Sequence, residues 1–239
     1  MTPLIFWKRG VIRLFYSLLK KLLLPENRYV WMLLYWPLMG AVFWSCELFV
    51  TWDFHPVYSR LDDMIPFIEY FVIPYYFWFI YIIGSMIYFF FRDKLAFVKY
   101  MWSVIITYTV TMLIYLIYPT CQELRPQLEA DNLCKRIIAL LYSYDTNTNV
   151  CPSIHVIGSF SVCFAAVSSK IIKSNLLKGL YVLFNVLICL STVFIKQHSV
   201  IDLISGVMLS YAAYPFVFSD NKISRFLCGM FYTSEKIQI

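Results

Sequence analysis

Six long apolar runs, separated by short polar segments, dominate the hydrophobic pattern of the chain. They cover roughly residues 29–51, 70–91, 95–118, 154–172, 178–196 and 199–218. A helix needs about 20 apolar residues to cross a hydrocarbon core about 30 Å thick. We therefore expect an all-α, polytopic membrane protein with six transmembrane helices in one domain.

The composition supports a membrane setting. Hydrophobic residues make up 61% of the 239 positions and charged residues 14%. In soluble domains about half of the residues are apolar and about a quarter are charged. The chain therefore does not have the composition of a soluble domain.

The positions of lysine and arginine predict the orientation, because cytoplasmic segments of membrane proteins carry an excess of both. With both termini inside, the inner segments hold Lys8, Arg9, Arg13, Lys20, Lys21, Arg28, Arg92, Lys94, Lys99, Lys170, Lys173, Lys178, Lys222, Arg225 and Lys236. The outer segments hold Arg60, Arg125, Lys135, Arg136 and Lys196. We expect a multi-pass protein of the plasma (cytoplasmic) membrane. Its net charge of +6 indicates membrane lipids as partners and no nucleic acid.

Three segments follow from this pattern. Residues 1–28 read as a basic amphipathic segment on the inner membrane surface or as a plain topology signal. Residues 29–218 form the predicted six-helix catalytic domain, and residues 219–239 a cytoplasmic tail. Glu47, inside the first run, either belongs to a site or reaches the interface.

The longest polar segment between two runs covers residues 119–153 and lies on the outer face in this topology. We expect a short helix near 133–143 within it, and a functional role for the loop, because long loops in compact domains are usually functional. Cys121, Cys134 and Cys151 share the loop. A disulfide among them is left open but not favoured, since three cysteines leave one unpaired.

Two histidines and an aspartate lie at the outer ends of apolar runs. His198 and Asp202 are four residues apart, so on a helix the carboxylate can hold the imidazole in one tautomer. This is the arrangement of an activated nucleophile. His155, at the start of another run, is suited to act as a general acid.

Groups that suit a phosphate accompany this trio. Arg125 and Lys196 provide positive charge, and the amides around Ser153 lie at an expected helix N-terminus, where anions are favoured. The combination predicts phosphoryl transfer through a phosphohistidine, with no metal or other cofactor.

These residues resemble the three signature motifs of the type 2 phosphatidate phosphatase superfamily. The matching segments are Arg125-Pro126, Pro152-Ser-x-His155 and Ser191-x6-His198-x3-Asp202. Their order, their spacing and their common face make the resemblance specific.

The resemblance implies a role for each matched residue. His198 is expected to be the nucleophile, Asp202 its orienting partner and His155 the general acid. Arg125 and Ser153 are expected to bind the phosphate.

Two positions depart from the family pattern. Tyr118 stands where the family usually has a lysine, and Thr192 stands where it usually has an arginine. Lys196 can replace one of these cations. The reduced cluster is similar to that of the inositol phosphorylceramide synthase branch, whose members pass a phosphoryl headgroup from a lipid to an alcohol.

The sequence therefore predicts an integral-membrane phosphatase that hydrolyses a lipid phosphate or diphosphate ester. One alternative is a lipid phosphotransferase, and a second is a catalytically silent lipid-binding protein. A small transporter is least favoured, because the runs show no clear inverted repeat. The particular lipid, the acceptor and the oligomeric state remain open.

Overall fold

The computed structural model describes residues 20, 23–49 and 53–232 and is built from helices, with one two-residue parallel ladder. The elements are η1 (Pro25–Leu34), α2 (Tyr35–Phe49), β1 (His55–Pro56), α3 (Arg60–Met64), η2 (Glu69–Phe71), α4 (Val72–Arg92), α5 (Lys94–Ile117), β2 (Thr120–Cys121), α6 (Leu133–Tyr144), α7 (Ile154–Ser168), α8 (Asn175–Phe194), α9 (Val200–Val217) and α10 (Lys222–Phe231). Most of the amphipathic segment expected over residues 1–28 lies outside the described residues.

Within the described residues, five helical stretches are long and apolar enough to cross a membrane, as expected of a multi-pass membrane protein. They are Pro25–Phe49, Glu69–Arg92, Lys94–Ile117, Asn175–Phe194 and Val200–Val217. The predicted count of six is not confirmed. The fourth predicted span is α7, which has 15 residues and a length of about 22 Å, short of the hydrocarbon thickness of about 30 Å.

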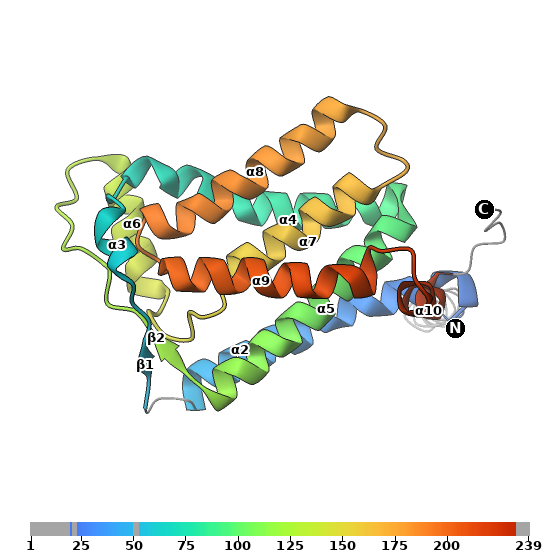
Figure 1. Ribbon diagram of the computed structural model, residues 1–239, viewed down its shortest axis with the longest axis horizontal. Coiled ribbons are helices and arrows are strands. Elements are labelled where there is room, and N and C mark those ends of the chain that lie inside the picture. The colour runs from blue at the N-terminus through green and yellow to red at the C-terminus, as the bar shows by residue number, and fades with distance from the viewer. Residues whose placement is uncertain (1–19, 21–22, 50–52, 233–239) are drawn as a thin grey trace, which may run out of the picture.

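Helix α7 can be short because other helices enclose it. It packs against α4, α5, α8 and α9 (Figure 1). Small side chains let these neighbours approach closely, and the hydroxyls of Ser103 and Ser161 meet at 2.8 Å between α5 and α7. A helix enclosed by other helices does not have to match the thickness of the lipid. The apolar character of α7 therefore agrees with its burial among the other helices.

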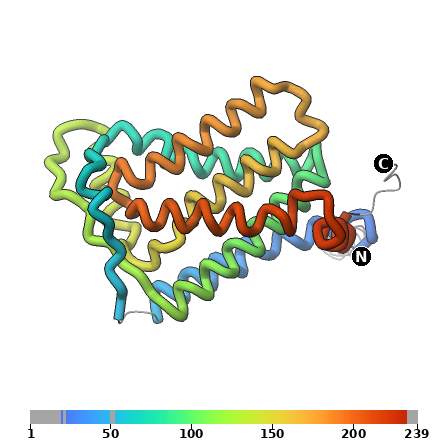
Figure 2. Tube along the Cα trace, viewed as in Figure 1, coloured from blue at the N-terminus to red at the C-terminus, as the bar shows by residue number. Residues whose placement is uncertain are grey.

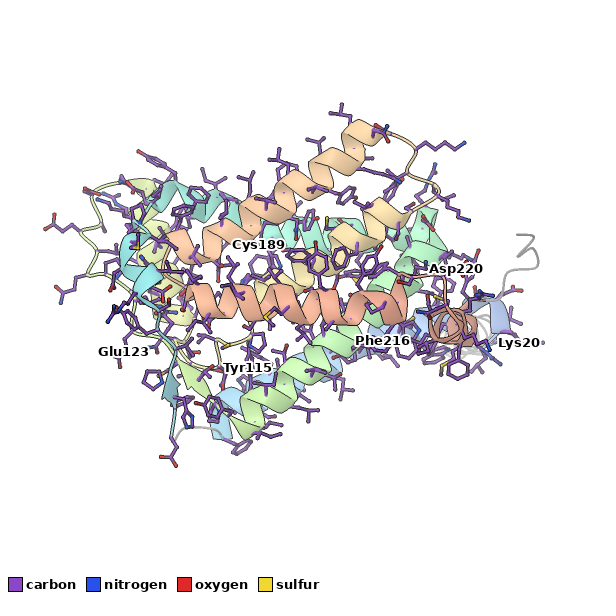
Figure 3. All side chains as sticks on the ribbon, viewed as in Figure 1. Lys20, Tyr115, Glu123, Cys189, Phe216 and Asp220 are labelled. Carbon is purple, nitrogen blue, oxygen red and sulfur yellow. The ribbon has the colours of Figure 1, made fainter. Side chains whose placement is uncertain are left out.

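The bundle has two distinct ends. Helices α3 and α6 and the β1–β2 ladder gather at one end, whereas α10 and the start of η1 lie at the other (Figures 1 and 2). In Figure 3, Glu123 lies at the first end and Lys20 and Asp220 lie at the second. The predicted loop helix is α6, and part of the predicted tail is α10, which packs on η1, α5 and α9.

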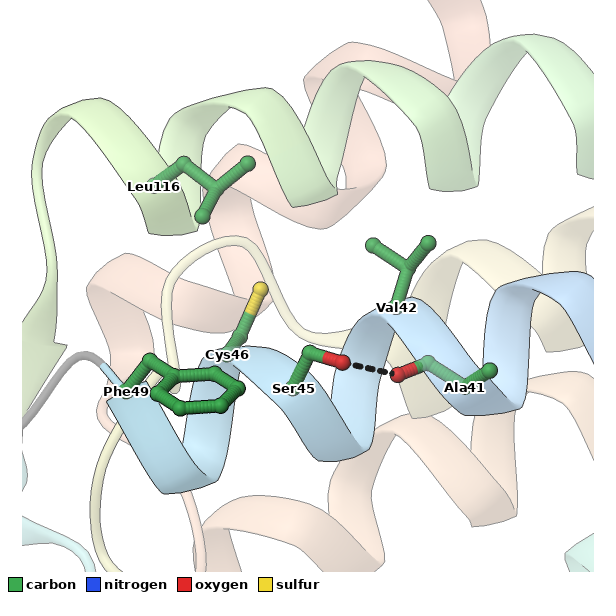
Figure 4. A pocket seen from close by; sticks show the side chains of 6 residues that line it. All are labelled: Ala41, Val42, Ser45, Cys46, Phe49 and Leu116. Atoms are coloured by element: carbon green, nitrogen blue, oxygen red, sulfur yellow. Dashed lines mark hydrogen bonds between the residues drawn. The ribbon is translucent and has the colours of Figure 1, made fainter.

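An apolar groove of about 320 Å³ runs between α2 and α5 (Figure 4). Its lining residues are Ala41, Val42, Ser45, Cys46, Phe49 and Leu116. The Ser45 hydroxyl donates to the Ala41 carbonyl at 2.7 Å, so its hydrogen bond is made within the helix. Ala41, Ser45 and Phe49 are four residues apart and share one face of α2. Phe43 and Glu47 project from the opposite side of α2, where Phe43 lines a second cavity and Glu47 binds Thr146.

The contact between α9 and α7 has no room for a side chain at Gly206. A Cβ there would lie 3.0 Å from Cβ and Cγ1 of Val156 and 3.3 Å from the carbonyl oxygen of Ser153. We predict that Gly206→Leu lowers the free energy of unfolding by about 1–3 kcal/mol, as overpacking does. Thermal unfolding in detergent measures the loss.

Gly179→Leu in α8 is the matched control, because a Cβ at Gly179 would meet nothing within 4 Å. Equal melting temperatures for the two variants would contradict the close packing of α7 against α9.

Candidate active site

The start of α9 pairs His198 with Asp202. Asp202 Oδ2 accepts from the backbone amide of Ser199 at 2.9 Å and lies 3.2 Å from Nδ1 of His198. The Ser199 side chain in turn accepts from the amide of Ile201, which completes a capping box. Asp202 is fully buried. Because Nδ1–H donates to the carboxylate, the lone pair of the neutral His198 ring is on Nε2.

His155 lies beside this pair, in the first turn of α7. The ring centroids of the two histidines are 5.7 Å apart. The rings of Tyr75 and Trp78 on α4 each lie with their centroids 4.6 Å from that of His155. Nδ1 of His155 is buried and has no hydrogen-bond partner among the described residues. Aromatic packing therefore holds this imidazole in place.

Helix α5 fixes the position of the α7 N-terminus. The hydroxyl of Tyr115 donates to the carbonyl of Pro152 at 2.7 Å, and that of Tyr108 donates to the carbonyl of Ile154 at 3.2 Å. The amide of Ser153 donates to the backbone carbonyl of Asp202 at 3.2 Å. Within the part of the chain that the structure describes, the buried Ser153 hydroxyl has no partner. The first amides of a helix are free to bind an anion.

A cavity of about 30 Å³ separates the two histidines. Its lining comes from α2, α5, the loop before α7, α7 itself and the segment before α9: Phe43, Tyr115, Asp145, Thr146, Thr148, Asn149, Val150, Ile154, His155, Gln197 and His198. His155 and His198, which are 43 positions apart in the chain, therefore face one common space.

The guanidinium of Arg125 binds the backbone of the loop before α7. Its two terminal nitrogens donate to the carbonyls of Tyr142 (3.3 Å), Asp145 (2.9 Å) and Thr146 (2.8 Å), and to Oε1 of Gln197 (2.6 Å). The guanidinium also lies 4.7 Å from the ring centroid of Tyr142. Burial lowers the pKa of Arg125, and the charge of Asp145 opposes this effect. Arg125 thus binds three residues of the cavity lining, Asp145, Thr146 and Gln197, without belonging to the lining itself.

Asp145 and Gln197 are site residues that the sequence did not reveal. Nε2 of Gln197 donates to Oδ2 of Asp145 at 2.9 Å, and the Tyr75 hydroxyl donates to the same oxygen at 3.5 Å. Burial raises the pKa of the Asp145 carboxyl, and the charges of His198 and Arg125 oppose the rise. The one available signal was that Gln197 directly precedes His198 in the chain.

Lys196 points away from the cavity. Its ammonium donates to the carbonyls of Asp62 and Ile65, both at 2.6 Å. Burial lowers the pKa of Lys196, opposed by the charges of Asp62 and Asp63. The predicted contact between Lys196 and a phosphate stays a prediction, and this structure gives the ammonium backbone carbonyls as partners.

The carboxylate of Asp62 ties the segment around α3 to the start of α9. Its Oδ1 accepts from the amide of Val200 at 2.8 Å, and its Oδ2 accepts from the hydroxyl of Ser199 at 2.7 Å. Asp62 is buried. Asp62 and Lys196 together therefore fasten α3 beside the His198–Asp202 pair.

The two positions that depart from the family pattern have other partners. The ring of Tyr118 stacks on His55 with the centroids 3.9 Å apart. Thr192 is fully buried, and its hydroxyl donates to the carbonyl of Cys189 at 2.7 Å. Neither side chain brings positive charge to the cavity.

Glu47 holds the loop to α2. Its Oε2 accepts from the hydroxyls of Thr146 and Thr148 at 2.6 and 3.2 Å, and its Oε1 accepts from the side-chain amide of Asn149 at 2.8 Å. Of the two interpretations of Glu47 drawn from the sequence, this geometry agrees with a place beside the site.

The cysteines of the loop are free thiols in the structure. Cys121, Cys134 and Cys151 form no disulfide among the described residues. Sγ of Cys151 lies 3.2 Å from the hydroxyl of Ser205, and burial raises the pKa of its thiol to about 11. In residues 20, 23–49 and 53–232, no three His, Cys, Asp or Glu side chains are grouped as ligands for a metal ion.

The fold and this site define a class: a multi-pass helical membrane protein with a histidine–aspartate pair and a second histidine at one end of its bundle. Residues 41–216, well over half of the chain, match the PAP2 superfamily. The chain therefore belongs to the PAP2 (type 2 phosphatidate phosphatase) superfamily. No curated protein and no solved structure matches it. Membership implies a phosphatase-type membrane enzyme that acts on phosphate esters.

The buried partners of Asp62 make it the chief anchor of α3. We predict that Asp62→Ala lowers the free energy of unfolding by about 1–3 kcal/mol, because it leaves the amide of Val200 and the hydroxyl of Ser199 without their acceptor. Thermal unfolding in detergent measures the effect.

Asp63→Ala is the control, since the exposed Asp63 side chain accepts from the hydroxyl of Tyr58 at the surface. A loss of stability in Asp63→Ala as large as in Asp62→Ala would contradict the anchoring role.

Proposed function

We propose that this protein is an integral-membrane phosphatase that hydrolyses a lipid phosphate or diphosphate ester through a phosphohistidine on His198. The observation that carries the proposal is the His198–Asp202 pair facing His155 across one cavity. A nucleophile held by a carboxylate, with an acid opposite, is the equipment that covalent phosphoryl transfer needs.

The proposed reaction has two halves. Nε2 of His198 attacks phosphorus while Asp202 holds Nδ1 and stabilises the positive charge that develops on the ring. The bond from phosphorus to the leaving oxygen breaks, and that oxygen takes a proton from His155. Water then attacks phosphorus, the bond from phosphorus to Nε2 of His198 breaks, and phosphate is released. The proton that water loses restores the acid form of His155.

The phosphate is bound by neutral donors and by one cation. The free amides in the first turn of α7 and the unpaired hydroxyl of Ser153 suit an anion. The positive charge of Arg125, which binds Gln197 of the cavity lining, attracts the phosphate. Lys196 would first have to leave the two carbonyls that it binds.

A lipid phosphotransferase is the second candidate, and the charge of the site favours it. Among the described residues around the cavity Arg125 is the one cation, Lys196 is turned away, and Asp145 adds a carboxylate. A phosphodiester donor carries one negative charge, whereas a phosphomonoester carries up to two. An alcohol acceptor would then replace water in the second half of the reaction.

The proposed mechanism demands His198. We predict that His198→Ala lowers turnover by at least about 10³-fold, because loss of a nucleophile leaves binding alone, and that its melting temperature stays near that of the wild type. The measurement is a product assay in detergent with labelled phosphatidate, isoprenoid diphosphate or phosphatidylinositol, each with and without ceramide or diacylglycerol.

The products separate the candidates. Free phosphate without acceptor, lost in His198→Ala, supports the phosphatase. Label that appears on the acceptor alone supports the transferase. No product from any donor, or full activity in His198→Ala, would contradict both and favour a silent lipid-binding protein.

We further propose that the end of the bundle with α3, α6 and the β1–β2 ladder, here called the loop end, faces outward from the plasma membrane. Both termini are then cytoplasmic, because fifteen of the twenty Lys and Arg residues fall in the inner segments. An epitope tag inserted after residue 129 should be stained on intact cells, and a tag after residue 239 only after permeabilisation. The reverse pattern would contradict this orientation, and internal staining of both tags would contradict the plasma membrane.

A further inference from the structure

Asp145 lines the cavity between the two histidines, and one of its carboxylate oxygens has no hydrogen-bond partner among the described residues. Both hydrogen bonds to its side chain, from Gln197 and from Tyr75, end on Oδ2. Oδ1 makes no hydrogen bond to any described residue, and the Asp145 side chain lines the cavity together with His155 and His198. Its one unoccupied oxygen is therefore available to a bound molecule.

The orientation of Gln197 decides which oxygen of Asp145 can carry a proton. Arginine has only donors, so the side-chain oxygen of Gln197 must face Arg125 and its amide nitrogen must face Asp145. Oδ2 is consequently fixed as an acceptor. A proton on this carboxyl group therefore has to be on Oδ1.

Neither of the other carboxylates near the site belongs to the lining of this cavity. Oδ1 of Asp202 also has no partner among the described residues, but it is fully buried and Asp202 does not line the cavity. Both oxygens of Glu47 are occupied by donors from the loop. Asp145 thus differs from both by facing the space where the reacting groups meet.

The charge of a carboxylate repels a phosphoryl group, so Asp145 is not suited to bind the phosphate. Its place in the cavity lining therefore suggests that it binds a different group. The group that it suits is the neutral hydroxyl that enters in the second half of the reaction. A cavity of about 30 Å³ holds a group of that size, since one water needs about 10–15 Å³ of such space.

We propose that Asp145 is a further catalytic residue, whose Oδ1 takes the proton from the hydroxyl that resolves the phosphohistidine. This inference rests on the proposed function. The oxygen of water or of an alcohol forms a bond to phosphorus, the bond from phosphorus to Nε2 of His198 breaks, and the hydroxyl proton passes to Asp145. The carboxylic acid then returns that proton to His155, which gave one to the leaving oxygen in the first half.

Two features of the site favour Asp145 over His155 as the acceptor of this proton. Packing against the rings of Tyr75 and Trp78 holds the imidazole of His155 in place for the leaving oxygen, whereas Asp145 lines the same cavity with an oxygen that has no described partner. The pKa of Asp145 is raised by burial, and a base works best when its pKa lies close to the ambient pH.

The test separates formation of the phosphohistidine from its decay. Asp145→Asn keeps the shape and the hydrogen bond from Gln197 in part but cannot accept the proton. With a labelled donor that the wild type uses, in single turnovers quenched in alkali, we expect formation within about threefold of the wild type. We expect decay at least about 100-fold slower, because a general base contributes about 10²–10⁴. Labelled enzyme should therefore accumulate.

Chemical rescue gives a readout that a purely structural role would not move. In Asp145→Ala the lost carboxylate leaves space, and added formate should restore part of the decay rate. Asp131→Asn is the matched control, since Asp131 is an exposed carboxylate on the same loop that pairs with Lys135 at 3.0 Å. It should behave as the wild type does, with or without formate.

Each outcome decides the proposal. Normal decay in Asp145→Asn overturns it, and so does an equal slowing of formation and decay without rescue by formate, which would make Asp145 a positioning residue. If Asp145→Asn does not fold, the rescue of Asp145→Ala and the decay rate of Asp145→Glu decide in the same way. A wild type that forms no phosphohistidine with any donor overturns the proposed function itself, and this inference with it.

Discussion

The buried carboxylate of Asp202 is the constraint on which the site depends. Its side chain holds the imidazole of His198 and caps α9 through the amide of Ser199, and its backbone carbonyl accepts from the amide of Ser153. Burial of a carboxylate is costly unless hydrogen bonds compensate for the lost water, and both donors to the Asp202 side chain meet its Oδ2. One residue therefore sets the tautomer of the proposed nucleophile, the start of α9 and the position of the helix that carries His155.

Hydrogen bonds within the protein, rather than contacts with lipid, determine the conformation of the segments at the loop end. Glu47 on α2, Arg125 in the loop and Asp62 at α3 each bind several backbone or side-chain groups of segments distant in sequence. Such contacts satisfy polar backbone that could not exist in hydrocarbon. They also close the loop over the two histidines, so that the reacting atoms lie inside the protein at the end of the bundle.

The local parts of this arrangement were predictable and the distant ones were not. The spacing of His198 and Asp202 on one helix face follows from periodicity alone, and the helix over residues 133–144 follows from its apolar pattern. Hydropathy also located α7 but could not show that other helices enclose it. The contact of Asp145 with Gln197 joins residues 52 positions apart, and the direction of Lys196 depends on a backbone turn with φ of 54°. Neither has a local signature.

The departures from the family pattern gain a physical meaning from these contacts. Tyr118 packs on His55, Thr192 bonds within its own helix, and Lys196 fastens α3. Each position thus has a structural role that does not require a cation at the phosphate. A cavity with Arg125 behind it and Asp145 facing into it compensates less negative charge than the full family cluster would. The charge of the substrate, more than the shape of its tail, should therefore decide which lipid phosphates this site accepts.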